Sequence, residues 1–184
     1  MLRGLQNRTM NSNSRELFPS LEDLGSATRY VGEIAEIVEH APIFDDLTLP
    51  EVESLCGFMH CFGAPREVTL IAEGSQGDFL LIILTGSVKV VKQAGAGTLA
   101  TVATVGPGAS LGEMSMIDGE PRFASCITVE PTDFAVLSRQ DLNEVLLSMP
   151  RLGNKLLLLL LQMMASRLRD MSNSLLPHIA GTSV

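Results

Sequence analysis

The residue types best suited to hold an anion lie together in residues 106–124, GPGASLGEMSMIDGEPRFA. Three glycines near the start of this segment leave backbone N–H groups open to close approach. Glu113 begins a short stretch that can form a helical turn, and N–H groups at the start of a helix suit an anion. Arg122 follows nine residues later and is the only basic residue between Lys92 and Arg139. The segment therefore combines open backbone donors with one isolated guanidinium.

An isolated arginine in acidic surroundings has two interpretations, which the composition leaves open. Because Glu113, Asp118 and Glu120 are its neighbours, Arg122 is either a structural arginine paired with a carboxylate or a clamp for an anionic ligand. Two other phosphate-binding motifs do not fit. The glycines are spaced one residue too widely for G-x-G-x-x-G and no βαβ pattern surrounds them, while the absence of a following lysine excludes a Walker A loop.

Short strands are the elements that must position this segment. Runs rich in β-branched and apolar residues, separated by Gly, Pro and Asp turn signals, occur at 68–71, 79–84, 88–91, 99–105, 126–129 and 134–137. Several short strands at near-regular spacing without long helices between them predict a sandwich, jelly roll or barrel over about 62–137.

Helical patterns flank the predicted strands on both sides. Apolar residues recur at helical spacing over 21–39, and Thr48 with Glu51 forms a capping-box signature for a second helix over 49–59. Ser138 is expected to cap a helix that ends near Leu147, and a longer helix follows over 152–175. The predicted fold is mainly β with flanking helices. Its expected parts are a disordered arm (1–20), a helical extension (21–41), one domain (42–176, with C-terminal helices at about 138–175) and a tail (177–184).

Composition excludes several functions. A net charge of −8 and one Tyr with no Trp argue against a basic DNA-binding surface and against an aromatic surface for single-stranded nucleic acid. Three cysteines without C-x-x-C spacing and three scattered histidines predict neither a zinc site nor a cupin-type metal enzyme. No Ser/His/Asp set is recognisable, so no enzyme and no catalytic residue are predicted. The longest apolar run is about half the ~20 residues that span a bilayer, and a cytoplasmic protein is expected.

An ordered set of motifs resembles the cyclic-nucleotide-binding domain, the family of the bacterial catabolite activator protein and of the regulatory subunits of cAMP-dependent protein kinase. The set covers roughly 43–171 and consists of Glu73-Gly74, FLLIILTGSV at 79–88, Gly106-Pro107-Gly108, LGEMS at 111–115 and PRFA at 121–124. The resemblance implies a jelly-roll barrel of the double-stranded β-helix type that binds cAMP as a regulatory ligand and needs no cofactor or metal.

The resemblance also implies roles for named residues. Arg122 would pair with the cyclic phosphate and Glu113 would accept the ribose 2′-hydroxyl. Backbone groups near Gly112, Met114 and Ala124 would complete the phosphate cradle. Matching ASRL at 165–168 to the family places Met171 and Ser172 against the base, where Met171 can cover a purine face and Ser172 can reach its edge.

Phe123 departs from the family, in which Ser, Thr or Ala usually follows the arginine. It removes a hydroxyl donor and adds bulk near the phosphate. Because a Thr at this position commonly bonds guanine in members that prefer cGMP, its absence favours cAMP over cGMP. The same departure supports an alternative, a degenerate domain that binds no nucleotide and acts as a structural dimer or partner-interaction module.

The long helix is the expected route for output. Leu157, Leu161, Met164, Leu168, Met171 and Leu175 form a heptad seam, which predicts a homodimer through residues 157–175. The alternative is that the helix packs on its own barrel, and the wide apolar face at 158–160 suggests both. The catabolite activator protein continues into a helix-turn-helix domain, and no such DNA-binding segment is expected in this chain. We therefore expect the signal to leave through the helices, the N-terminal extension or an unidentified protein partner.

Overall fold

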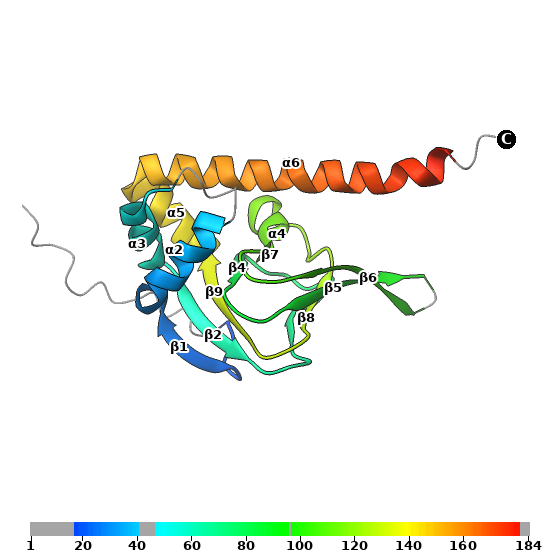
Figure 1. Ribbon diagram of the computed structural model, residues 1–184, viewed down its shortest axis with the longest axis horizontal. Coiled ribbons are helices and arrows are strands. Elements are labelled where there is room, and N and C mark those ends of the chain that lie inside the picture. Colours follow the sequence, from blue (N-terminus) through cyan, green and yellow to red (C-terminus); the bar gives the residue numbers. More distant parts are fainter. Residues whose placement is uncertain (1–16, 41–46, 96, 181–184) are drawn as a thin grey trace, which may run out of the picture.

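The computed structural model describes residues 17–40, 47–95 and 97–180, with the backbone alone at 38–40 and 174–180. Two antiparallel sheets face each other, and helices cover one end of them (Figure 1). The first sheet has the strand order β1-β2-β9-β4-β7 and the second has the order β3-β8-β5-β6. The predicted jelly-roll architecture with flanking helices is therefore confirmed, as two packed sheets.

The strands of the first sheet differ from the sequence-based expectation at three places. The sheet contains β1 (Glu22–Ser26), β2 (His60–Ala64), β4 (Phe79–Ile83), β7 (Ser110–Leu111) and β9 (Thr132–Ser138). The strands β1, β2 and β7 were not predicted. β2 begins at His60, directly after the segment expected to be helical up to residue 59, and β7 is only two residues long and lies within the glycine-rich segment.

The second sheet carries the strands that flank the candidate site. It contains β3 (Thr69–Ile71), β8 (Ser125–Thr128), β5 (Val88–Ala94) and β6 (Thr98–Val105). β5 and β6 form a hairpin that extends away from the body of the sheets on the same side as the far end of the long helix (Figure 1). β6 is an edge strand, and its side chains are exposed along nearly its whole length, including Leu99 and Val102.

The predicted N-terminal helix is wrong over its first part. Residues 22–26 form β1, which pairs with β2, and the chain then passes through a 3-10 turn η1 (Ala27–Tyr30) into α2 (Val31–His40). Gly25 has a φ of +90°, which lies outside the helical range, and Ser26 caps the following turn by accepting a hydrogen bond from the Thr28 N–H. Pairing with β2 thus overrides the helical spacing of the apolar residues.

The end of the predicted disordered arm is also ordered. Phe18 lies within the expected arm of 1–20, yet its ring contacts Phe62, Phe79 and Phe134 at centroid distances of 5.2–5.4 Å in edge-on geometry. These aromatic contacts anchor residues 17–20 on the core between the sheets, and the prediction is wrong there. Residues 1–16 lie outside the described part of the chain, as do the end of the predicted helical extension at residue 41 and the end of the predicted tail at 181–184.

The remaining helices agree with the sequence more closely. The α3 helix (Leu49–Cys56) starts at the predicted Thr48–Glu51 capping box, and α5 (Arg139–Ser148) starts at the predicted Ser138 cap. A short helix, α4 (Glu113–Asp118), opens where a helical turn was expected. The long helix, α6 (Pro150–Ala180), is 31 residues long and exceeds its predicted bounds at both ends.

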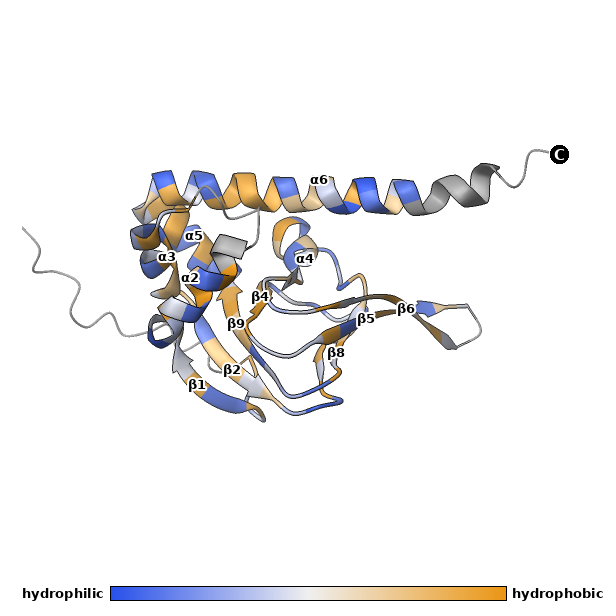
Figure 2. Cartoon of the chain, in the orientation of Figure 1, coloured by the Kyte–Doolittle hydropathy of each residue, from blue (hydrophilic) through white to orange (hydrophobic). Residues whose placement is uncertain are grey.

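Two apolar cores hold these elements together. One lies between the sheets around Phe62, Leu81, Ile83 and Phe134. The other lies between the first sheet and the helices, and it includes Leu156, Leu159, Leu160 and Met163 of α6. The longest apolar stretch of α6, residues 156–161, lies in its first half, and polar residues follow it along the coloured part of the helix (Figure 2). No helix in the described ranges is long and apolar enough to cross a membrane.

Candidate functional site

Arg122 is buried next to the start of α4. Its side chain is 3% exposed, Nη1 donates a hydrogen bond to the Gly112 carbonyl oxygen at 2.7 Å, and the guanidinium lies 4.3 Å from the centroid of the Phe79 ring. No carboxylate in the described ranges forms an ion pair with it, and Nη2 is buried without a hydrogen-bond partner there. The paired-structural interpretation of Arg122 therefore finds no support in these contacts.

Two glycines make room for this guanidinium. A Cβ at Gly77 would lie 2.5 Å from Nη2 of Arg122, and a Cβ at Gly112 would lie 2.5 Å from Nη1. Gly112 also has a φ of +88°, which L side chains rarely adopt. Gly112 of the glycine-rich segment and Gly77 outside it thus pack closely on two sides of one arginine.

Backbone hydrogen bonds fix the position from which Arg122 projects. The Arg122 N–H donates to the Ser75 carbonyl at 2.8 Å, and the Gly74 N–H donates to the Arg122 carbonyl at 2.8 Å. On the other side, Nη2 of Arg139 at the start of α5 donates to the Ser115 carbonyl of α4 at 2.7 Å. The segment 112–124 is therefore held between the loop after β3 and the helix that leads into α6.

Glu113 is the first residue of α4, and its side chain is fully buried. Its Oε1 forms an ion pair with Nη1 of Arg167 on α6, and Nη2 of Arg167 donates to the Ser110 carbonyl at 2.6 Å. The other carboxylate oxygen, Oε2, is buried and has no hydrogen-bond partner among the described residues. One carboxylate thus connects α4 to α6 and keeps one acceptor unused.

Burial is the main influence on both charged groups. It raises the pKa of Glu113, while the neighbouring Arg167 and Arg122 act in the opposite direction. Burial also lowers the pKa of Arg122, against the effect of nearby acidic groups. Because a guanidinium stays protonated in proteins, Arg122 remains a cation that favours a negatively charged group beside it.

Phe123 lies outside the apolar cores. Its side chain is 47% exposed, and the ammonium of Lys92 on β5 lies 4.2 Å from the centroid of its ring. The Phe123 side chain, which was expected to add bulk near the phosphate position, therefore contacts Lys92. Of the neighbouring residues named by the resemblance, Ala124 is 8% exposed and buried, whereas Met114 is 39% exposed.

The residues predicted to meet a base lie on the exposed part of α6. Met171 is 57% exposed, and the Ser172 hydroxyl donates to the Leu168 carbonyl of its own helix at 2.8 Å. Their predicted contact with a base remains a prediction. The sequence analysis used Arg167 only to match ASRL to the family and gave it no role, although it is the first basic residue after the apolar run that follows Lys155.

The two packing modes expected for α6 occupy different faces of the helix. Leu156, Leu159, Leu160 and Met163 are buried against the chain's own sheet. Four residues of the predicted heptad seam are exposed instead, at 40% for Leu157, 64% for Leu161, 66% for Leu168 and 57% for Met171, whereas Met164 is half-buried. The side chain of Leu175, the last seam residue, lies outside the described residues.

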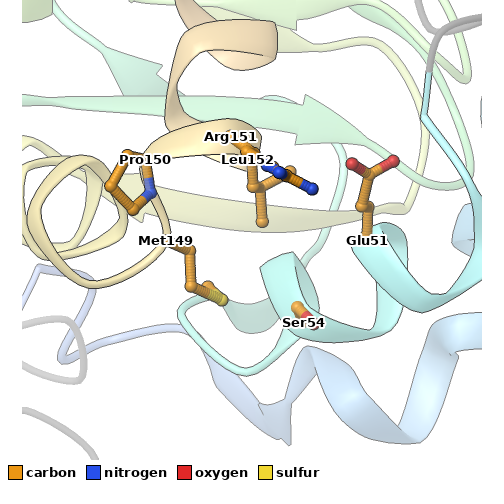
Figure 3. A pocket seen from close by; sticks show the side chains of 6 residues that line it. All are labelled: Glu51, Ser54, Met149, Pro150, Arg151 and Leu152. Atoms are coloured by element: carbon orange, nitrogen blue, oxygen red, sulfur yellow. The ribbon is translucent and has the colours of Figure 1, made fainter.

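One concavity of the structure is remote from this site. It has a volume of about 520 Å³ and is lined mostly by apolar groups at the junction of α3 with α6 (Figure 3). Its wall includes Glu51, whose pKa is lowered to about 2 mainly by its hydrogen bond with Lys155. Because α6 rises 1.5 Å per residue, Leu152 in this wall is about 22 Å along the helix from Arg167. The concavity therefore has no part in the Arg122–Glu113 site.

The two packed sheets thus enclose a buried guanidinium that forms no ion pair with a carboxylate among the described residues and lies beside glycines. Comparison with known proteins shows that residues 63–149 match the family model "Cyclic nucleotide-binding domain". The chain is also similar to the crystal structure of a cyclic nucleotide-binding domain from Methylobacillus flagellatus. That likeness has 48% identity and a TM-score of 0.82, and covers 91% of this chain and 96% of the other. The chain belongs to the cyclic nucleotide-binding domain family.

Two further relatives show the range of the family. A CRP-like cAMP-activated global transcriptional regulator of Mycobacterium tuberculosis is 31% identical over 140 residues, which are 76% of this chain and 61% of the regulator. The regulatory subunit of a cAMP-independent protein kinase A from Trypanosoma brucei is 25% identical with a TM-score of 0.58, over 67% of this chain and 45% of the subunit. The chain thus spans less than two thirds of both relatives, which are named as regulatory proteins.

The Arg167–Glu113 ion pair generates a pH-dependent prediction. In Arg167→Gln, the buried carboxylate loses its partner, so the pKa of Glu113 rises further. A raised pKa of a carboxyl in the folded state costs stability above the unfolded value of about 4.5. Because Arg167 is itself partly exposed, we expect Arg167→Gln to lower the free energy of unfolding by about 1.5–3 kcal/mol at pH 7.5, and by much less at pH 4.5.

Urea unfolding at the two pH values measures this difference. Arg169→Gln is the matched control, because Arg169 is an exposed arginine on the same helix. A deficit that is equal at both pH values would show that Arg167 stabilises the fold through packing and not through the charge of Glu113.

Proposed function

We propose that this domain binds cAMP and acts as a regulatory module. The observation that carries the proposal is that two of the three buried polar atoms without a hydrogen-bond partner among the described residues lie at this site, Nη2 of Arg122 and Oε2 of Glu113. A buried donor or acceptor without a partner costs about 1–3 kcal/mol, so such atoms are retained where a ligand satisfies them. One atom is a cationic donor and the other is an anionic acceptor.

A cyclic nucleotide offers groups that complement both atoms. Its cyclic phosphate carries one negative charge, which Arg122 would pair with through planar donors. Its ribose 2′-hydroxyl is a donor that Glu113 would accept. Backbone groups near Gly112, Met114 and Ala124 complete the cradle on this proposal. One buried cation balances a monoanionic ligand, so the site works within a chain of net charge −8.

The choice of cAMP over cGMP rests on Phe123. A phenylalanine side chain has no hydroxyl with which to bond guanine, and the mycobacterial relative is named as cAMP-activated. The contacts proposed for Met171 and Ser172 would come from α6, and they require that part of the helix to approach the bound base. The helix would then carry the binding signal away from the sheets.

A second candidate function is a nucleotide-free domain that serves as a structural dimer or partner-interaction module. The T. brucei relative is named as part of a cAMP-independent kinase, so kinship alone does not fix the ligand. Isothermal titration calorimetry with cAMP and cGMP at physiological salt separates the two functions. Heat of binding with cAMP supports the first, and no heat with either nucleotide supports the second.

Replacement of Arg122 tests the phosphate contact. Arg122→Gln removes a buried cation that has no carboxylate partner among the described residues, and losing one member of a buried charge pair costs about 3–5 kcal/mol. We expect the cAMP affinity to fall by at least roughly 10²-fold. The control is Arg66→Gln, since Arg66 is exposed and pairs with the neighbouring Glu67. A native thermal melt with unchanged cAMP affinity in Arg122→Gln would rule out the phosphate role.

The ribose contact is tested with a ligand and the unaltered protein. The analogue 2′-deoxy-cAMP lacks the donor proposed for Oε2 of Glu113, and it should bind more weakly than cAMP by about 1–3 kcal/mol. Competition against a fluorescent cAMP analogue gives both affinities under one condition. Equal affinities would assign Glu113 to the ion pair with Arg167 alone.

We further propose that the exposed seam of α6 joins two copies of the chain. Its residues repeat at steps of four and three, which is the spacing of a two-stranded coiled coil, and they lie on a face separate from the one packed on the sheet. Exposed leucines at this spacing lose apolar surface to water when two such helices pair. A cAMP-dependent change in this pairing would transmit the signal to an effector.

Sedimentation equilibrium tests the dimer. Leu161→Glu with Leu168→Glu places four carboxylates at the centre of the seam and should convert a dimer to a monomer at micromolar concentration. Leu147→Glu on α5 is the matched control, because Leu147 is 84% exposed and lies off the seam. Equal masses for the native protein and the double variant, with a native melt for both, would contradict the proposal.

A further inference from the structure

Phe123 is partly exposed, but its ring and its backbone both contact Lys92. The Lys92 ammonium that lies over its ring also donates a hydrogen bond to the Phe123 carbonyl at 2.6 Å. The same ammonium donates to Oε1 of Glu73 at 2.8 Å. One lysine on β5 thus contacts the ring, the backbone of the same residue and a carboxylate from the loop after β3.

Glu73 in turn connects the strands around Phe123. Its Oε2 accepts a hydrogen bond from the Gln93 N–H at 2.8 Å, and its own N–H donates to the Ser125 hydroxyl at 2.9 Å. The hydrogen bond from Lys92 is the main reason that the pKa of Glu73 is lowered, which keeps the carboxylate charged. Hydrogen bonds among β5, β8 and the loop after β3 therefore fix the position of Lys92, which contacts the ring of Phe123.

The position of this ring gives it a surface for a ligand. Phe123 directly follows Arg122, so its side chain begins one residue from the group proposed to hold the phosphate. It remains 47% exposed although Lys92 covers part of it. A flat apolar surface that is fixed, solvent-exposed and next to an anion-binding arginine suits the aromatic base of a nucleotide whose phosphate is bound.

We propose that Phe123 is a specificity-determining residue that stacks on the base of the bound cyclic nucleotide and selects purines over pyrimidines. This inference rests on the proposed nucleotide-binding function. The larger ring system of a purine covers more of the phenyl ring than a pyrimidine does, and stacking of one base on an aromatic side chain is worth about 1–3 kcal/mol. Lys92 is the positioning residue, because it holds the ring and does not itself meet the base.

The test compares cAMP, cGMP, cCMP and cUMP by calorimetry. In Phe123→Ala, the affinities for cAMP and cGMP should fall roughly 5- to 100-fold. Those for cCMP and cUMP should fall much less, so that the purine-to-pyrimidine ratio moves toward one. Phe123→Tyr keeps the aromatic ring and should keep the ratio. Phe123→Leu keeps apolar bulk without a ring and should behave like Phe123→Ala.

Two further measurements separate stacking from a structural role. In the complex, the C2 and C8 protons of bound cAMP should show upfield ring-current shifts in proton NMR with the native protein, and these should be smaller with Phe123→Leu. Lys92→Met should reduce the purine preference partly. Lys89→Met is its control, since Lys89 is a similarly exposed lysine of β5 that lies 3.8 Å from Glu67.

The outcomes distinguish this inference from the function on which it rests. An unchanged purine-to-pyrimidine ratio in Phe123→Ala, with Arg122→Gln still abolishing binding, overturns the role of Phe123 and leaves the phosphate clamp standing. An equal loss for all four nucleotides also overturns it, because the ring would then only support the fold. If the native protein binds no cyclic nucleotide, both proposals fail together.

Discussion

Burial of two opposite charges within one short segment is the constraint on which the rest of this structure depends. Glu113 and Arg122 are withdrawn from water, and transferring an ionised group to the interior costs several kcal/mol unless other groups compensate it. Compensation is incomplete on both sides. Arg122 donates a hydrogen bond to the Gly112 carbonyl and lies over the Phe79 ring, and Arg167 forms an ion pair with one oxygen of Glu113. Nη2 of Arg122 and Oε2 of Glu113 have no hydrogen-bond partner among the described residues. The surrounding glycines and short strands follow from the need to bring backbone close to these groups.

The long helix α6 is part of the site because its Arg167 compensates the buried charge of Glu113. The cation comes from α6, which otherwise packs through leucines on the first sheet. Any ligand group that approaches Glu113 changes the balance between this carboxylate and Arg167. Because a ligand shifts a conformational equilibrium only by its differential affinity for the two states, this ion pair is where binding energy would act on the position of α6.

Local patterns predicted the parts of the fold that depend on neighbours in sequence. The capping residues Thr48 and Ser138 mark true helix starts, and most strands lie where β-branched runs occur. The failures come from partners far away in the chain. Residues 22–26 have helical spacing but pair with β2, and Phe18 is ordered by rings that lie more than forty residues further along. Glu113 and Arg122 were recognisable from an ordered motif, whereas Arg167 and Lys92 act across 54 and 31 residues. A local sequence pattern cannot predict contacts between residues that are so far apart in the chain.

The edge strand β6 has a consequence for the behaviour of the protein in solution. From residue 93 to residue 112 the sequence carries no Lys, Arg, Asp or Glu, and β6 lies in the middle of this stretch with Leu99 and Val102 exposed. Natural sheets usually protect an open edge with charge, proline or a covering element, since unpaired N–H and C=O groups recruit other strands. The net charge of −8 opposes contact between whole molecules, but none of that charge lies on β6. Resistance to aggregation therefore depends on repulsion from a distance, and it weakens as added salt shortens the range of that repulsion.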